Sequence, residues 1–193
     1  MHLHLRAACA LLLVAGVSTT TSCARIFGGS GAKIEVPEMD TPREQAEIAS
    51  RQFARANQTV DEKLRREEMQ KAVKAFDVVI ERFPLDRTYT PASRLLRADL
   101  FFQMDKFKES EDAYREVISL YPDIADIHAG ALYGLGQSLY EQKRFREGKE
   151  AFRQLLDQYQ NASEPSIRDR VRRARLKYEQ INSTGDEFFT RSE

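Results

Sequence analysis

The stretch AYREVISLYP, residues 113–122, occurs in related form at two other places in the chain. The sequence reads AFDVVIERFP at residues 75–84 and AFRQLLDQYQ at residues 151–160, so each copy starts 38 residues after the previous one. Similarity that recurs at a period of roughly 20 to 50 residues is the signature of stacked supersecondary units. The interval therefore predicts a repeat protein.

Each copy closes a segment with the apolar pattern of two helices. In the third copy, Leu132, Leu135 and Leu139 fall on one helical face, and Phe152 lies on the apolar face of a second helix. The segment EQKR, residues 141–144, has no apolar residue and marks the turn between them. Proline is the last residue of the first two copies, where it ends a helix because it lacks an amide donor. The pattern predicts helical hairpins in series.

The stretch LYGLGQSLYEQKRFREGKEAFRQLLDQY, residues 132–159, resembles a tetratricopeptide repeat. Members of that family place an aliphatic residue before a small one, as Leu135 and Gly136 do here. In the second copy Arg97 takes the aliphatic position, and in the third copy Gln160 replaces the closing proline. The interval also exceeds the usual repeat of about 34 residues. We expect the additional residues in the connections between repeats.

The resemblance implies an all-α fold, a right-handed α-solenoid of about three helical hairpins and a C-terminal capping helix. The expected boundaries are 43–84, 91–122 and 127–160 for the hairpins, 164–182 for the capping helix and 183–193 for a tail. The first helix should begin at TPRE, residues 41–44, where Thr41 and Glu44 can form a capping box. A solenoid's last helix covers apolar surface on one side and meets water on the other.

Composition and charge limit the possible functions. The 193 residues include 30 Lys and Arg and 30 Asp and Glu, so the formal net charge is zero and no global field favours nucleic acid. Beyond the first 24 residues, His128 is the only histidine and no cysteine remains. Neither a catalytic cluster nor a set of metal ligands is therefore indicated. We expect no enzyme activity, no cofactor, no metal and no nucleic-acid partner.

The N-terminus has the pattern of an export signal. Residues 1–24 combine Arg6, the apolar run AACALLLVAGV and the small residues STTTSCA. A run this short cannot span a bilayer as a helix, which needs about 20 residues, so a secretory signal is expected. Residues 25–42 are rich in glycine and proline and predict a flexible tether.

The end of this signal leaves two alternatives. TTSC, residues 20–23, resembles a bacterial lipobox and predicts lipidation at Cys23, although Thr20 stands where an aliphatic residue is usual. Lipidation would anchor the protein at the periplasmic face of the outer membrane. Cleavage after Ala24 by an ordinary signal peptidase would instead leave a soluble periplasmic or secreted protein.

The resemblance to tetratricopeptide repeats also implies a binding surface, because the first helices of such repeats line a concave groove. Matching the pattern onto this chain predicts a partner-binding groove formed by Leu95, Asp99, Phe102, Gln103, Tyr133, Gln137, Tyr140 and Glu141. Aromatic rings beside amide and acid groups suit the capture of an extended peptide or a partner helix. The alternative is that Phe102 and Tyr140 only seal neighbouring helices.

The run RDRVRRARLK, residues 168–177, is the one strongly basic stretch. It could contact anionic lipid or cell wall, or it could be a solvated face of the capping helix. The basic side chains are Arg168, Arg170, Arg172, Arg173, Arg175 and Lys177.

Residues 45–160, with their helix endings RFP and LYP, are similar to a periplasmic family that includes the lipoprotein of the β-barrel assembly machinery and the cell-division coordinator. This similarity implies a non-enzymatic scaffold of the bacterial envelope, which binds a protein or peptide partner through the groove and the membrane through a lipid anchor. The alternative is a surface-binding module that docks on lipid or cell wall through the basic helix.

Overall fold

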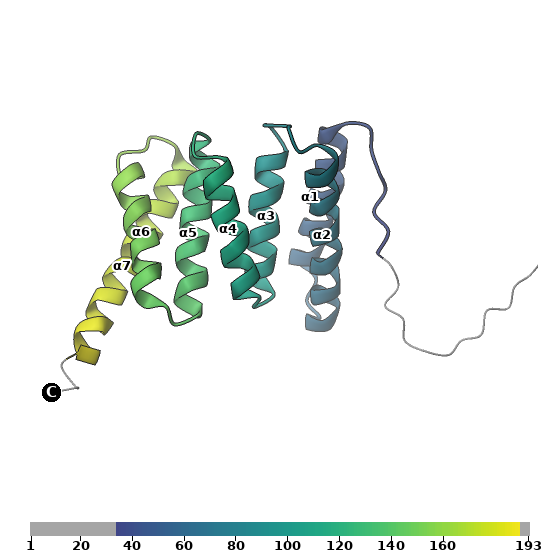
Figure 1. Cartoon of the computed structure of the whole chain (residues 1–193). Coiled ribbons are helices and arrows are strands. Elements are labelled where there is room, and N and C mark those ends of the chain that lie inside the picture. The colour runs from purple at the N-terminus through teal and green to yellow at the C-terminus, as the bar shows by residue number, and fades with distance from the viewer. Residues whose placement is uncertain (1–33, 190–193) are drawn as a thin grey trace, which may run out of the picture. The chain divides into compact units, whose positions relative to one another are not determined.

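The computed structural model describes residues 34–189, which form seven α-helices and no strand (Figure 1). In chain order the helices are α1 (Pro42–Gln58), α2 (Glu62–Arg82), α3 (Thr90–Gln103), α4 (Phe107–Leu120), α5 (Ala125–Glu141), α6 (Phe145–Tyr159) and α7 (Pro165–Phe189). Within this described part, no helix combines the length and the apolar character that a membrane span requires. The all-α fold expected from the sequence is confirmed.

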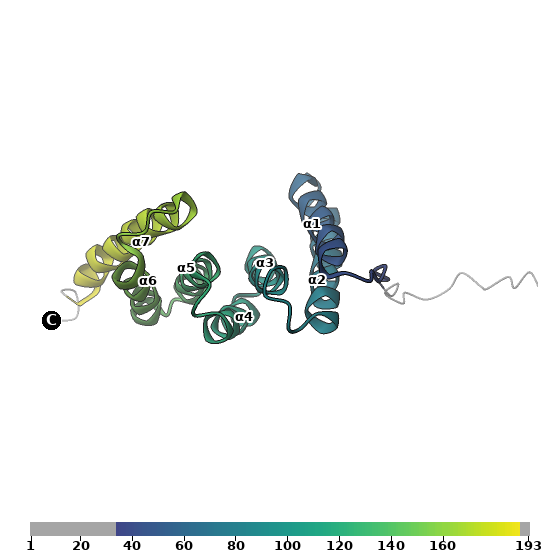
Figure 2. The same ribbon diagram turned by 90° about the horizontal axis from the view of Figure 1, so that it is seen from above.

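The helices pair in series as hairpins. Helix α1 packs on α2, α3 on α4 and α5 on α6, and α7 packs against both α5 and α6. Seen from above, α1, α3, α5 and α7 lie along the inner, concave side of a curved row, and α2, α4 and α6 lie along its outer side (Figure 2). Three hairpins and a closing helix are the arrangement that the sequence predicted.

The apolar core is divided among three clusters, and each cluster reaches from one hairpin into the next. The first joins α1 and α2 to Leu100 of α3 and to Met104, which directly follows α3. The second joins α3 and α4 to Leu135 of α5, and the third joins α5 and α6 to Ile167 of α7. Each hairpin therefore completes its apolar face only with its neighbour, as stacked repeats do.

The 38-residue interval marks equivalent positions in the second helices. Phe76 in α2, Tyr114 in α4 and Phe152 in α6 are 1%, 2% and 0% exposed. Where the Phe152 ring crosses α5, the facing residue is Gly136, and a Cβ there would lie 2.5 Å from Cε1 of the ring. A small residue is needed at that crossing because the interior is close-packed.

The turns of the second and third hairpins share one conformation. Asp105 and Lys143 have φ angles of 60° and 64°, in the left-handed region. The residue after each turn donates its amide proton to a carbonyl five residues earlier, at 2.9 Å from Lys106 N to Phe101 O and 2.9 Å from Arg144 N to Leu139 O. This hydrogen bond is typical of a right-handed helix that ends in a residue with the left-handed backbone conformation.

The first helix begins as predicted, but the segment before it is not wholly a free tether. Thr41 caps α1 by accepting from Glu44 N at 3.2 Å. Before the cap, Gln45 holds the chain at two points, donating to Pro37 O at 3.1 Å and accepting from Met39 N at 2.7 Å. Val36 packs on the first apolar cluster. The expected tether of residues 25–42 is thus attached to the domain over its last part.

The C-terminal helix is longer than expected. Helix α7 continues to Phe189, so residues 183–189, which were expected to be a tail, are helical. The predicted signal of residues 1–24, with its lipidation site Cys23, lies outside the described residues, as do residues 25–33 and 190–193.

Candidate binding groove

The predicted groove residues lie on α3 and α5, two of the helices that line the concave side of the row (Figure 2). Four of them, Leu95, Asp99, Tyr133 and Gln137, line a pocket of about 230 Å³. Gly130 and Gly134 of α5 and Arg170 and Arg173 of α7 complete its wall. We call this the α3/α5/α7 pocket.

The other four predicted residues lie nearer the C-terminal ends of α3 and α5 and do not line the pocket. The Phe102 ring meets the Phe107 ring edge to face, with centroids 5.5 Å apart. The Tyr140 ring meets the Phe145 ring in the same way at 5.1 Å. Each pair joins the two helices of one hairpin, so these two rings do seal their hairpins. Gln103 and Glu141 are exposed.

Asp99 forms the acidic wall of the pocket. Its Oδ1 atom accepts a hydrogen bond from the Tyr114 hydroxyl at 2.5 Å. Burial raises the pKa of Asp99, while the Tyr114 hydrogen bond and the charge of Arg170 only partly oppose this effect. Burial and the Asp99 charge raise the pKa of Tyr114, so its phenol remains a donor. The ionised carboxylate is therefore held where its charge is incompletely compensated.

Gly134 allows this contact. A Cβ atom at position 134 would lie 2.2 Å from Cζ of the Tyr114 ring, so the ring passes directly over the α5 backbone on its way to Asp99. The buried hydroxyls of Ser110 and Ser138, on the same two helices, are 2.9 Å apart. Polar contacts thus also join α4 to α5.

Helix α7 brings half of the basic side chains to the same surface. Arg170 Nη1 donates to Asp126 Oδ1 at 2.6 Å, and the Arg173 guanidinium lies 5.1 Å from the Tyr133 ring centroid. Lys177 Nζ lies 4.7 Å from the Tyr140 ring centroid. Cations at these distances are attracted to the ring faces. The predicted groove and the predicted basic helix are therefore parts of one surface.

The remaining basic side chains face away from α5 or pair on α7 itself. Arg172 forms an ion pair with Asp169, which Arg173 also contacts at 2.6 Å. Arg168 and Arg175 are exposed. The sequence-based prediction grouped the six basic side chains of α7 together, although the helical spacing of positions 170, 173 and 177 places those three on one face. It also missed Asp126, Gly130 and Gly134, whose roles depend on how α7 and α4 meet α5.

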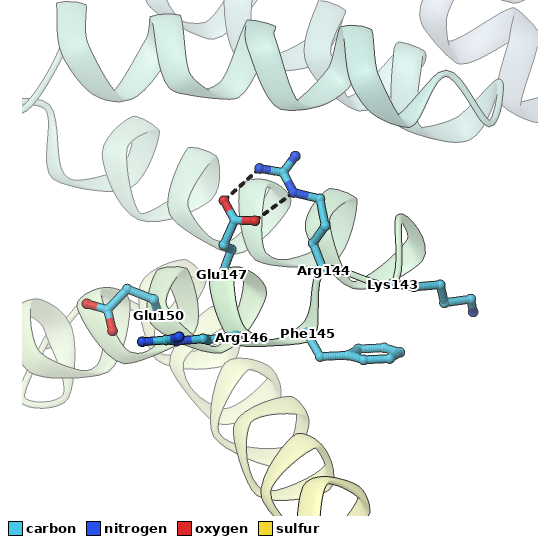
Figure 3. Close-up of a pocket in the computed structure, with 6 residues that line it drawn as sticks. All are labelled: Lys143, Arg144, Phe145, Arg146, Glu147 and Glu150. Atoms are coloured by element: carbon cyan, nitrogen blue, oxygen red, sulfur yellow. Dashed lines mark hydrogen bonds and ion pairs between the residues drawn. The ribbon is translucent and has the colours of Figure 1, made fainter. Parts of the chain in front are cut away.

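A second, open hollow of about 780 Å³ lies at the turn between α5 and α6. Figure 3 shows Arg144 and Glu147 turned toward each other, while Lys143 and Phe145 point away from them. Arg144 Nη1 also donates to Glu111 at 2.6 Å. Arg144 and Glu147 are thus engaged in holding the turn, and the side chains that line this hollow do not converge on a common point.

The described residues contain no group of three or more His, Cys, Asp and Glu side chains that could hold a metal ion. Within them, His128 is 5% exposed and its Nδ1 lies 2.9 Å from the Tyr159 hydroxyl. Burial lowers the pKa of His128. We interpret it as a core side chain that joins α5 to α6.

Comparison with known proteins identifies the repeat. Two family models described as tetratricopeptide repeat match the chain, one over residues 91–124 and the other over residues 130–162. Comparison with curated proteins gave no match. The matched segments correspond to the α3–α4 and α5–α6 hairpins, whose first helices supply six residues of the pocket wall. The chain is thus an all-α repeat protein whose residues 91–124 and 130–162 match tetratricopeptide repeats, a type of repeat that generally mediates protein–protein interaction.

Proposed function

We propose that the protein is a non-enzymatic scaffold of the bacterial cell envelope that binds an extended peptide or a partner protein in its concave groove. The observation that carries this proposal is the α3/α5/α7 pocket, where acidic, basic, amide and aromatic side chains from three helices converge. Such a mixture suits a peptide, whose backbone needs hydrogen bonds and whose side chains need individual subsites.

The pocket also has groups free to bind. The Gln137 side chain is half-buried and forms no hydrogen bond with the described residues. Its amide can donate to a carbonyl and accept from an N–H group of a passing peptide. Within the described residues, Arg170 uses only Nη1 in hydrogen bonds, so its other nitrogens can also donate.

Site-specific photo-cross-linking in the native cells tests the use of the groove. A photo-reactive residue at position 103 or 141, both exposed at the C-terminal ends of α3 and α5, should form cross-links to a partner. The matched controls are position 115 on α4 and position 153 on α6, exposed on the outer helices. Cross-links from the controls alone would contradict the proposal.

The envelope location is supported by the N-terminal sequence pattern, with its short apolar run and TTSC before residue 24. We propose lipidation at Cys23 and attachment to the periplasmic face of the outer membrane. Mass spectrometry of the mature N-terminus should find a lipid-modified chain that begins at Cys23. An unmodified chain beginning at Arg25 would contradict lipidation.

The surface-binding alternative retains one specific support. Arg168 and Arg175 are exposed on α7, and Leu176 beside them is 62% exposed. Binding to vesicles of anionic lipid that disappears as salt is raised, and that is lost when Arg168 and Arg175 are both changed to Gln, would favour this alternative. Partner binding that is lost in Tyr133→Ala or Tyr140→Ala would favour the groove.

A further inference from the structure

The size of the α3/α5/α7 pocket limits what it can hold. Its volume is about 230 Å³. Pockets for drug-sized ligands and cofactors measure roughly 300 to 1,000 Å³, so this one has room for about a single side chain. The pocket lies in the concave groove, where an extended peptide could place one residue into it.

The charges in the pocket are unequally paired. Arg170 forms an ion pair with Asp126 at 2.6 Å, and Arg173 forms one at 2.6 Å with Asp169, which also pairs with Arg172. Asp99, in contrast, has only the neutral Tyr114 phenol as a hydrogen-bond donor among the described residues. The contact uses Oδ1, which leaves Oδ2 without a donor from this part of the chain. Among the charged side chains that line the pocket, Asp99 is therefore the one without a charged hydrogen-bond or ion-pair partner in the described residues.

Burial of Asp99 raises its pKa, which means that its ionised form is disfavoured in the free protein. Arg170 offsets this effect through its charge but forms no hydrogen bond with the carboxylate. A ligand that supplied a cationic hydrogen-bond donor would offset the free-energy cost of keeping the buried Asp99 carboxylate ionised. Asp126 has a different environment: burial raises its pKa, but hydrogen bonds from Ser166 and Arg170 prevail and lower it.

We propose that the pocket binds a lysine or arginine side chain of an extended peptide, with the Asp99 carboxylate as its counter-ion and the Gln137 amide bonded to the peptide backbone. This inference rests on the proposed function, since it names the peptide chemistry that the same groove selects. An acidic side chain would instead face Asp99 and find both arginines already paired.

A peptide library tests this selectivity. The probe is a library of random ten-residue peptides, acetylated and amidated so that free termini cannot bind, and it is screened against the full mature chain. The wild-type protein should enrich Lys or Arg at one peptide position about tenfold or more over Ala. Asp99→Asn should abolish this enrichment, whereas Asp157→Asn should retain it, because α6 contributes no residue to the pocket.

Asp99→Asn is suited to the test because the oxygen of the asparagine amide can still accept the hydrogen bond from the Tyr114 hydroxyl. Asn also removes a buried charge, so the melting temperature of Asp99→Asn should equal or exceed that of the wild type. If the variant melted lower, Asp99→Glu, which keeps the charge and should retain the basic preference, would serve as the second variant. A basic preference that survives in folded Asp99→Asn overturns the proposal.

The outcomes separate this inference from the proposed function. Enrichment of acidic peptides, or binding without preference, overturns the inference, while cross-links from positions 103 and 141 would still support the groove. If no peptide binds and the groove positions form no cross-link, both proposals fail.

Discussion

Glu111 is a buried carboxylate that ties α4 to the turn between α5 and α6. Its side chain is 2% exposed and accepts hydrogen bonds from Arg144 Nη1 at 2.6 Å, Gln142 Nε2 at 3.1 Å and Arg115 Nε at 3.1 Å. Burial raises the pKa of Glu111, but the hydrogen bonds from Gln142, Arg115 and Arg144 prevail and lower it from 4.5 to about 2. The charged form is therefore the one that stabilises the fold.

Because the pKa is lower in the folded state, the unfolded chain binds the proton first as pH falls. The stability from Glu111 is complete above pH 4.5 and is lost as pH falls toward about 2. We expect Glu111→Gln to lower the free energy of unfolding by about 2 kcal/mol at pH 7, with a smaller difference from the wild type below pH 4.5. Urea denaturation followed by circular dichroism at several pH values measures this. Asp112→Asn, an exposed control on the same helix, should change little; a constant Glu111→Gln deficit at all pH values would contradict the assignment.

Gly134 is a second position where one residue decides a contact. The Cβ of Ala at 134 would lie 2.2 Å from Cζ of Tyr114, whose ring is enclosed and hydrogen-bonded to Asp99. We expect Gly134→Ala to lower the free energy of unfolding by about 2 kcal/mol. Gly130→Ala is the control on the same helix, because its Cβ would meet a Leu95 methyl at 2.9 Å, and that side chain can shift. Equal effects in thermal melts of the two variants would show that the Tyr114 contact is not the cause.

At the scale of elements, the turns of the second and third hairpins each hold a residue other than glycine in the left-handed backbone conformation, which is unfavourable. Lys143 has a φ angle of 64°, a conformation that costs a residue with a Cβ atom about 1 kcal/mol relative to glycine. We expect Lys143→Gly to raise the free energy of unfolding by about 0.5 to 1 kcal/mol. Asp105→Gly should raise it less, because Asp tolerates this region better. Lys106, with a φ angle of −86°, is the control, and Lys106→Gly should destabilise the protein in chemical denaturation.

The hairpins could be predicted from sequence because their apolar positions repeat at a fixed interval and pack against equivalent positions. The start of α1 was also predictable, since Thr41 and Glu44 are local signals. The docking of residues 34–40 was not, because it depends on one amide side chain, Gln45, that reaches back to Pro37 and Met39. Such a contact leaves no periodic pattern in the sequence.

The groove was predictable only in part for a related reason. The family pattern predicts groove residues on α3 and α5, and Asp99 and Gln137 are two of the four that line the α3/α5/α7 pocket. The register of α7 against α5 decides that Arg173 meets Tyr133 and that Lys177 meets Tyr140. No local spacing in either helix determines that register, so the groove and the basic helix were predicted as separate surfaces.

At the scale of the whole domain, each described hairpin contacts only the hairpins next to it in the row, and α7 contacts only the last hairpin. Phe76 belongs to the cluster that joins α1 and α2 to α3, and Phe152 belongs to the cluster that joins α5 and α6 to α7. Neither cluster includes a residue of the other. In such a row the stability is approximately a sum of repeat and interface terms. A destabilising substitution at one end of the row should therefore reduce stability mainly at that end.

We expect Phe152→Ala to lower the free energy of unfolding by about 3 to 5 kcal/mol, since the ring is fully buried and its loss leaves a cavity between α5, α6 and α7. Hydrogen exchange followed by mass spectrometry should show greater loss of protection in α5, α6 and α7 than in α1 and α2. Phe76→Ala is the matched variant at the other end and should show the reverse pattern, because its ring belongs to the first cluster. Uniform loss of protection in both variants would mean that the domain unfolds as one cooperative unit. The opposite gradients would instead show that α1 and α2 can remain folded while the wall of the α3/α5/α7 pocket opens at α7.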